Sequence, residues 1–192
     1  MNFCTLCGNK LTLRIPEQDD RLRHVCDKCG YIHYQNPRII VCSIPAWEDK
    51  VLLCKRAIEP RYGLWTLPGG FMENGETTQE AAIRETHEEA CARIAVHDLY
   101  SLFNVAHIDQ VHLFYRATLL DPNIAAGTES LEVALCSAAE VPWHELAFPA
   151  VACTLQQYFL DLPQQHFPLR LADIVIDADN TRNIKAHNFT LQ

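Results

Sequence analysis

The segments GFMENGE at residues 70–76 and RETHEE at residues 84–89, separated by seven residues, decide the fold of this sequence. The stretch from Thr77 to about Ala92 contains neither glycine nor proline, has several alanines and carries acidic residues near its start. These features predict a helix, preceded by a loop rich in glycine and proline. The second segment therefore lies on the predicted helix, and the first leads into it.

Three glutamates of the predicted helix project from one face. Glu85, Glu88 and Glu89 occupy positions i, i+3 and i+4, so their carboxylates are within reach of a shared ion. Their mutual repulsion predicts a raised pKa for at least one of them. The helix has no lysine to neutralise them, whereas Mg²⁺ and Mn²⁺ prefer such oxygen ligands. Arg84 can reach Glu88 or brace Glu76, and so orient the ligands.

An acidic helix by itself is usually a solvated surface, and only the spacing of the two segments argues otherwise. That spacing resembles the Nudix box, carried here by Gly70, Glu76, Arg84, Glu85, Glu88 and Glu89. The preceding GLWTLPGG at residues 63–70 is similar to the lead-in of that family. The resemblance extends from about Pro37 to Leu160. Thr86 and the Cys91-Ala92 pair depart from the pattern, which leaves the end of the helix open.

The resemblance implies an α+β fold, a Nudix α/β/α sandwich with a mixed β-sheet. It also implies divalent-metal-dependent hydrolysis of a nucleoside diphosphate linked to another moiety, since metals neutralise the anionic bridge and lower the pKa of the attacking water. The implied metal ligands are Glu85, Glu88, Glu89 and the Gly70 carbonyl, with Arg84 and Glu76 in support.

The general base stays open between two places in the chain. Members of this family use either a glutamate of the box, here Glu89, or one on a later loop. The later candidates are Glu129 and Glu132, of which Glu132 directly precedes a predicted strand. An exposed position at the start of that strand is the competing interpretation of both residues.

Two cysteine pairs predict a separate zinc ribbon at residues 1–35. Cys4 and Cys7 are separated by eighteen residues from Cys26 and Cys29, and four thiolates can close a tetrahedral shell around Zn²⁺. A closed shell leaves no open position, so this zinc is expected to be structural. The module is locally basic, which keeps a nucleic-acid or protein contact in view. The net charge of −8 makes nucleic acid an unlikely partner.

Apolar periodicity predicts the remaining elements of a domain at residues 36–162. Strands are expected at 38–44, 50–55, 94–107, 110–120 and 131–136, and a closing helix at 149–161. The tail at 163–192 could pack on the domain or on a dimer partner, with a further strand at 171–176. The five single cysteines are expected to be small core residues; they are Cys42, Cys54, Cys91, Cys136 and Cys153.

A zinc ribbon followed by a Nudix domain is similar to two groups, the NADH pyrophosphatases and a subgroup resembling FAD and ADP-ribose pyrophosphatases. The SQPWPFP signature of the first group is missing, and VPWHELAFP at residues 141–149 resembles the second. The favoured substrate is therefore FAD or ADP-ribose, giving AMP and the phosphorylated other half. NADH or NAD is the alternative. A non-catalytic nucleotide sensor, nucleotide sanitation and RNA cap removal are further alternatives.

Aromatic residues near the box are candidates for stacking on the substrate. Trp65, Phe71 and Phe148 are the expected contacts, together with the backbone of Gly69 and Gly70; Tyr62, Phe103 and Phe114 are weaker candidates. For each aromatic residue, packing in the core competes with ligand contact. The N-terminus lacks the features of a signal peptide and no apolar run is long enough to span a bilayer, so we expect a cytoplasmic protein, with a homodimer typical of the family.

Overall fold

The computed structural model describes residues 1–177 and 181–191. The chain divides into two compact units, Met1–Pro37 and Arg38–Gln192, and each is described by itself. We call them the ribbon and, after the family that its sequence resembles, the Nudix unit.

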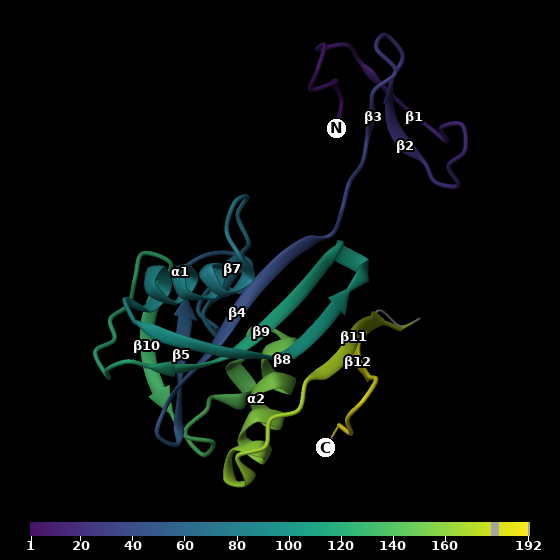
Figure 1. Ribbon diagram of the computed structural model, residues 1–192. Coiled ribbons are helices and arrows are strands. Elements are labelled where there is room, and N and C mark those ends of the chain that lie inside the picture. Colours follow the sequence, from purple (N-terminus) through teal and green to yellow (C-terminus); the bar gives the residue numbers. More distant parts are fainter. Residues whose placement is uncertain (178–180, 192) are drawn as a thin grey trace. The chain divides into compact units, whose positions relative to one another are not determined.

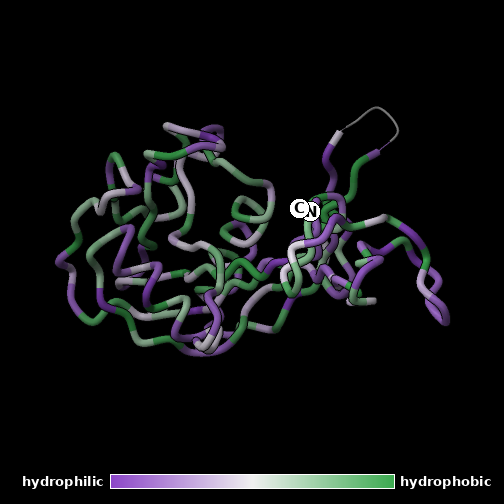
Figure 2. Tube along the Cα trace, turned by 90° about the horizontal axis from the view of Figure 1, so that it is seen from above, coloured by the Kyte–Doolittle hydropathy of each residue, from purple (hydrophilic) through white to green (hydrophobic). Residues whose placement is uncertain are grey.

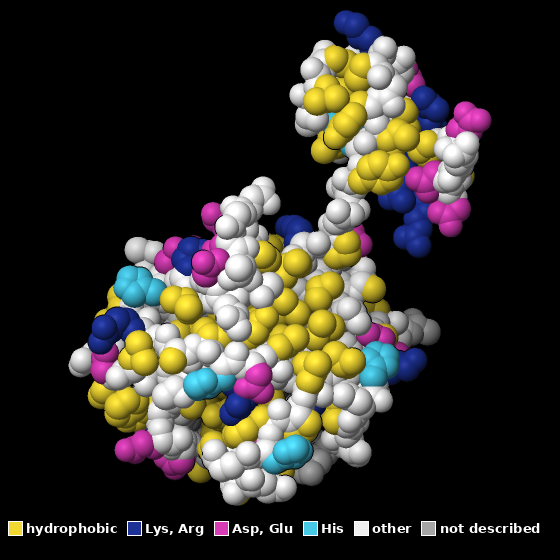
Figure 3. Space-filling model, in the orientation of Figure 1, with side chains coloured by type: hydrophobic (Ala, Val, Ile, Leu, Met, Phe, Trp, Pro, Cys, Tyr) yellow, Lys and Arg dark blue, Asp and Glu magenta, His cyan; other side chains and the backbone are white. Residues whose placement is uncertain are grey.

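The ribbon is a small antiparallel sheet with very little core. Its strands are β1 (Leu11–Arg14), β2 (Arg23–Cys26) and β3 (Ile32–His33), in the order β1-β2-β3. Each cysteine pair is followed by a glycine with positive φ, Gly8 and Gly30, a conformation that glycine adopts without steric cost. Its buried hydrophobic side chains are Cys4, Val25 and Cys26. Figure 3 shows hydrophobic side chains over much of the visible surface of this unit instead.

The Nudix unit is built on a mixed sheet. The strands are β4 (Arg38–Trp47), β5 (Lys50–Arg56), β6 (Trp65–Thr66), β7 (Gly69–Phe71), β8 (Ile94–Val105), β9 (Gln110–Leu119), β10 (Ser130–Cys136), β11 (Arg170–Ile176) and β12 (Arg182–Ala186). Their order is β10-β5-β4-β9-β8-β11-β12, with β6 on β5 and β7 on β4. The pairs β4–β9 and β8–β11 are parallel and the other pairs are antiparallel. This confirms the predicted mixed sheet.

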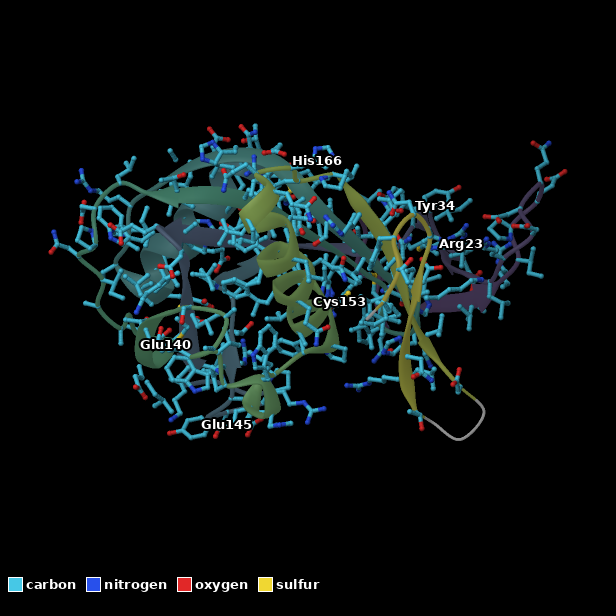
Figure 4. The ribbon with its side chains drawn as sticks, turned by 90° about the horizontal axis from the view of Figure 1, so that it is seen from below. Arg23, Tyr34, Glu140, Glu145, Cys153 and His166 are labelled. Carbon is cyan, nitrogen blue, oxygen red and sulfur yellow. The ribbon has the colours of Figure 1, made fainter. Side chains whose placement is uncertain are left out.

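One long helix covers each face of this sheet, α1 (Thr78–Ala90) and α2 (Pro149–Asp161) (Figure 1). The core beneath α2 contains Leu53, Phe103, Phe114 and Cys153; the labelled Cys153 lies on α2 in Figure 4. Smaller clusters beneath α1 contain Ala81 and Ala82, and Ala90 at its end. Short 3₁₀ helices lie at Ala106–Ile108, Trp143–Glu145 and Leu162–Gln164. The two-sided sandwich follows from strands whose alternate residues are apolar on both faces.

Helix α1 has a defined cap at each end, and it stops two residues before the end that the sequence predicts. Thr77 and Glu80 form a capping box at its start, which satisfies backbone N–H groups of the first turn. The helix ends at Ala90, and Cys91 takes a left-handed conformation with φ 51°. Cys91 is exposed, so its prediction as a core residue is wrong. The helix has ended at this position, and the left-handed turn leaves the side chain in solvent. The other four single cysteines are buried.

The C-terminal tail joins the sheet through β11, which pairs in parallel with β8 and carries β12 as an outer hairpin strand. Arg170 of β11 is buried, and its guanidinium lies 2.6 Å from Asp161 of α2 and donates to Gln157 at 3.1 Å. The predicted strand at 171–176 is confirmed. Strand β12 was not predicted, and neither were the short strands β6 and β7 in the glycine-rich loop.

In the described part of the chain, no helix is long and apolar enough to cross a membrane. Figure 2 colours the chain by hydropathy, and short hydrophobic stretches alternate in it with hydrophilic ones.

Candidate active site

Helix α1 holds two of its glutamates against the backbone of β7. Glu85 and Glu89 are 9% and 5% exposed. The Gly69 N–H donates to Glu89 Oε2 at 3.3 Å. A Cβ atom at Gly70 would lie 2.5 Å from Glu85 Oε1, so any larger residue at this position would displace the carboxylate from where it lies. The loop and the helix therefore depend on each other to form one carboxylate site.

Arg84 connects Glu85 of this pair to Glu76 and Glu88. Its guanidinium lies 2.7 Å from Glu76, 2.7 Å from Glu85 and 3.1 Å from Glu88, and it also donates to the Phe71 carbonyl at 3.1 Å. The hydrogen bond from Arg84 holds the pKa of Glu76 near 2. Charge-assisted bonds of this kind fix the orientation of carboxylates, so Arg84 braces Glu85 and Glu88 from outside the buried pair.

The buried pair has raised pKa values. Burial is the main cause for both residues; it raises the pKa of Glu85, and raises that of Glu89 to about 8. Repulsion adds to this, from Glu88 and Glu129 on Glu85 and from Glu85 and Glu129 on Glu89. The predicted rise therefore occurs, with desolvation as a larger cause than the repulsion that the sequence suggests.

The loop between β9 and β10 closes over the end of α1. The Gly127 N–H donates to the Glu89 carbonyl at 2.9 Å, and the Ala57 N–H donates to the Glu129 carbonyl at 2.8 Å. A Cβ atom at Gly127 would lie 1.8 Å from the Glu88 carbonyl oxygen. These contacts tie the loop to both β5 and α1, and they place the charge of Glu129 close enough to act on Glu85 and Glu89.

Glu132, the other late-loop candidate, lies elsewhere. It pairs with Lys55 in the β10–β5 register, and the two side chains form an ion pair at 3.6 Å. Leu53, two residues from Lys55, packs in the core beneath α2. Because alternate residues of a strand share a face, Lys55 and Glu132 lie on the face opposite α1. The geometry therefore does not support Glu132 as the base.

The candidate aromatic residues divide into core and accessible groups. Phe103 and Phe114 are both buried and contact each other edge to face with centroids 5.8 Å apart, so they are core residues. Trp65 is also largely buried, with the Lys55 ammonium 5.6 Å from its ring centroid. Phe71 is 46% exposed and carries the Arg38 guanidinium 4.7 Å from its ring centroid.

Phe148 and Tyr62 complete this set. Phe148 precedes α2 and is partly buried, with the Arg56 guanidinium 5.2 Å from its ring centroid. Tyr62 is exposed in the loop after β5. Arg56 was missed in the sequence. The only signal for it is a basic residue at the end of a strand, just before a glycine-rich loop, which is common in proteins.

The ribbon cysteines fit Zn²⁺ in both their chemistry and their positions, whereas the carboxylate site fits Mg²⁺ or Mn²⁺ in its donor chemistry. The carboxylate site offers hard oxygen donors, a buried pair with raised pKa values, and a glycine that leaves space for them. In the ribbon, the sulfurs of Cys4, Cys7, Cys26 and Cys29 all lie within 4.8 Å of one another. The Sγ–Sγ distances of 3.7 Å (Cys4–Cys29) and 3.4 Å (Cys7–Cys26) are near the ~3.8 Å edge of a zinc tetrahedron with Zn–S bonds of about 2.3 Å.

Comparison with known families identifies the class that this fold and site define. A family model described as NUDIX domain matches residues 36–157, and one described as Nudix N-terminal, a zinc ribbon, matches residues 2–35. The chain belongs to the Nudix family, and its N-terminal unit is the zinc ribbon of that family.

Two individual relatives and one solved structure show which members of the family the chain is similar to. The chain is 31% identical over 146 residues to the NAD-capped RNA hydrolase NudC of Photobacterium profundum, covering 73% of this chain and 52% of that protein. It therefore spans about half the length of this relative. It is 30% identical over 122 residues to the ADP-ribose pyrophosphatase of Methanocaldococcus jannaschii, covering 62% of this chain and 71% of that protein. A crystal structure of a Nudix hydrolase from Nitrosomonas europaea has 48% identity and a TM-score of 0.86, covering 90% of this chain and 99% of that one.

Proposed function

We propose that this protein is a Nudix pyrophosphohydrolase that cleaves the diphosphate bridge of an ADP-containing compound, FAD or ADP-ribose, and releases AMP. The observation that carries the proposal is the buried pair Glu85 and Glu89, held against the glycine backbone of β7. Arg84 neutralises Glu85, but no described side chain forms an ion pair with Glu89, and a buried carboxylate without a counter-ion costs stability. A cation bound to the pair would offset that cost.

Each residue of the site has a proposed part. Glu85, Glu88, Glu89 and the Gly70 carbonyl would hold Mg²⁺ or Mn²⁺, and Arg84 with Glu76 would keep the ligands oriented. Such ions supply charge neutralisation and activation of water at a phosphorus centre.

Glu129 is our candidate for the general base, because its loop is bonded to the end of α1 and its charge acts on both residues of the buried pair. Glu89 of the box is the alternative base. The ribbon cysteines would hold a structural Zn²⁺.

The choice of FAD or ADP-ribose is supported by the VPWHELAFP segment and by the similarity to the archaeal ADP-ribose pyrophosphatase. A second candidate substrate class is NADH, NAD or NAD-capped RNA, which the similarity to the NudC protein of Photobacterium profundum favours. An RNA substrate would make nucleic acid a partner after all. A homodimer remains a prediction of the family resemblance, to be measured by sedimentation.

Product analysis separates these possibilities. The purified, zinc-loaded protein is incubated with FAD, ADP-ribose, NADH and an NAD-capped oligoribonucleotide, each with Mg²⁺ or Mn²⁺. We expect AMP from FAD or ADP-ribose, and we expect Glu89→Gln to lower the rate by more than the roughly hundredfold that loss of a supporting partner costs. Glu48→Gln, an exposed position in the β4–β5 turn, is the matched control and should be unchanged. AMP release mainly from NADH or capped RNA would reject the favoured substrate, and no turnover of any compound would reject the enzymatic function.

Glu129→Gln and Glu132→Gln test the base. We expect the first variant to lose turnover at saturating Mg²⁺ and the second to keep it. Loss in the second variant alone would overturn the assignment of Glu129.

A further inference from the structure

Arg56 ends β5 beside the carboxylate site and makes no ion pair with any described residue. Three other arginines near the site and the core are neutralised: Arg84 by three glutamates, Arg116 by Asp98 and Arg170 by Asp161. Arg38, which lies over the Phe71 ring, also has no ion pair with a described residue. Lys55, the neighbour of Arg56 in the chain, is paired with Glu132. A partly buried guanidinium left without a counter-ion is costly unless a ligand supplies one.

The Arg56 side chain is nevertheless held in place. Its Nε donates to the Pro60 carbonyl at 2.9 Å, and its guanidinium carbon lies 5.2 Å from the centroid of the Phe148 ring. The backbone is fixed as well, because the Arg56 N–H donates to the Leu64 carbonyl at 2.9 Å. Among the described residues, Nε is the only side-chain nitrogen of Arg56 that donates a hydrogen bond. The Nη1 and Nη2 groups are therefore available as a planar pair of donors.

Arg56 lies next to the acidic residues of the site. The positive charge of Arg56 acts on Glu89 of the buried pair and on Cys42 beneath Gly69. Its strand partner in the β5–β10 register is Ser130, the residue after Glu129. Arg56 is thus close to Glu89 and to the Glu129 loop, yet its side chain bonds to neither of them.

We propose that Arg56 binds a phosphate of the diphosphate substrate through its two Nη groups, with Phe148 as the residue that positions the guanidinium. This inference rests on the proposed function. A planar guanidinium suits two-point recognition of a phosphate, which a lysine ammonium cannot reproduce. One face of the Phe148 ring is then occupied by Arg56, so Phe148 acts on the substrate mainly through this arginine.

The test compares Arg56→Gln and Arg56→Lys with Arg61→Gln, a control that removes the same charge from an exposed position five residues further along the loop. Two quantities are measured on the zinc-loaded protein. The first is the Kd of ADP-ribose by titration calorimetry without Mg²⁺ or Mn²⁺, and the second is KM and kcat for whichever nucleotide the unaltered protein hydrolyses.

We expect Arg56→Gln to raise both Kd and KM roughly ten- to hundredfold, the range for loss of hydrogen bonds to a charged group. Arg56→Lys keeps the charge but loses the planar fork, so its Kd and KM should lie between those of the unaltered protein and those of Arg56→Gln. Phe148→Leu should raise KM by less than Arg56→Gln, and Arg61→Gln should stay within about twofold of the unaltered protein.

Unchanged Kd and KM in Arg56→Gln, with ADP-ribose bound and turned over by the unaltered protein, would overturn the inference and leave the proposed function intact. If the unaltered protein hydrolyses no nucleotide, the proposed function fails, and the Kd comparison still decides the part of Arg56. Should Arg56→Gln melt at a lower temperature, Arg56→Lys carries the comparison, and full affinity in that variant would reject two-point recognition.

Discussion

The ribbon and the Nudix unit use cysteine and glutamate clusters in opposite ways. The ribbon has three strands of two to four residues and exposes Phe3, Leu6 and Tyr34. Its Arg23 guanidinium lies 5.1 Å from the centroid of the exposed Tyr34 ring (Figure 4). The Nudix unit has a large core beneath α2 and two smaller hydrophobic clusters beneath α1. In the first unit the metal ligands replace a core, whereas in the second a core supports the metal ligands.

This difference teaches what each metal contributes. Four thiolates brought together by a thin sheet have little else to hold them, so metal binding and folding are one process there. In the Nudix unit, helix α1, β7 and the Gly127 loop already hold Glu85 and Glu89 close together. A cation at that site is expected to complete chemistry and not to create the fold.

Loss of one ribbon cysteine is expected to have the largest effect. Cys26→Ser should unfold residues 1–35, because a structural zinc site contributes about 10–16 kcal/mol of folding free energy in isolated fingers. Amide signals of the ribbon in a ¹H–¹⁵N NMR spectrum should collapse toward unfolded positions, while those of the Nudix unit stay dispersed. Cys153→Ser, a buried cysteine in the core beneath α2, is the comparison, and it should leave the ribbon signals unchanged. Ribbon signals that stay dispersed in Cys26→Ser would contradict the comparison.

The reverse experiment weakens the Nudix unit alone. Arg170→Ala removes one partner of a buried ion pair and leaves the Asp161 carboxylate without its counter-ion, with a hydrogen bond from the Tyr100 hydroxyl. Breaking a buried pair in this way costs about 3–5 kcal/mol. The expected result is a lower midpoint for the Nudix unit in urea, with the zinc content of the ribbon unchanged. Arg182→Ala, an exposed arginine on β12, serves as the control. Equal stability of the two variants would show that β11 is not fixed to α2 by this pair.

A smaller effect is expected where Thr86 departs from the aliphatic residue of the family pattern. Thr86 and Ser43 are fully buried and their hydroxyl oxygens lie 2.6 Å apart. Thr86→Val leaves the Ser43 hydroxyl without a partner, which costs about 1–3 kcal/mol. Ser43→Ala together with Thr86→Val should recover much of that loss, since both polar groups are then gone. Urea unfolding of the two single variants and the double variant measures the coupling, and strictly additive losses would reject it.

The smallest effect on stability at neutral pH is expected for His112. Burial lowers the pKa of this residue from 6.5 to about 4. Between these values the unfolded chain binds a proton that the folded chain excludes, so stability falls as pH drops from 6.5 toward 4. His112→Gln should remove this part of the acid dependence and leave stability above pH 7 nearly unchanged in slope. Thermal unfolding of both proteins from pH 8 to pH 4 measures the difference. Parallel curves would contradict the lowered pKa.

Elements with long apolar or helical patterns could be predicted from the sequence. Helix α1, helix α2 and the strands from β4 to β10 with more than five residues all lie close to their predicted positions. Strands β6 and β7 have two and three residues. Strands this short form because a neighbour pairs with them, and no periodicity can reveal them. Cys91 shows the same limit at a helix end, where one residue decides whether a side chain enters the core.

The site could be predicted as a set of residues but not as an arrangement. The spacing of Glu85, Glu88 and Glu89 predicts that they share a face of one helix, and the structure places them there. The choice between Glu129 and Glu132 depends on a register shift between Ser130 and Glu132, which decides the face on which each side chain lies. The proposed part of Arg56 could not be predicted, because it rests on the absence of an ion-pair partner. Only the folded chain shows which charges lie near this residue.

Hydrogen exchange with mass spectrometry tests the central difference between the two units most directly. The protein is stripped of metal and compared with samples to which only Zn²⁺ or only Mg²⁺ is added. We expect Zn²⁺ to restore protection in residues 2–35 alone, and Mg²⁺ to add protection only around β7, the end of α1 and the Gly127 loop of a Nudix unit that stays folded throughout. A ribbon that is protected without zinc, or a Nudix unit that loses protection across its sheet without Mg²⁺, would contradict this account.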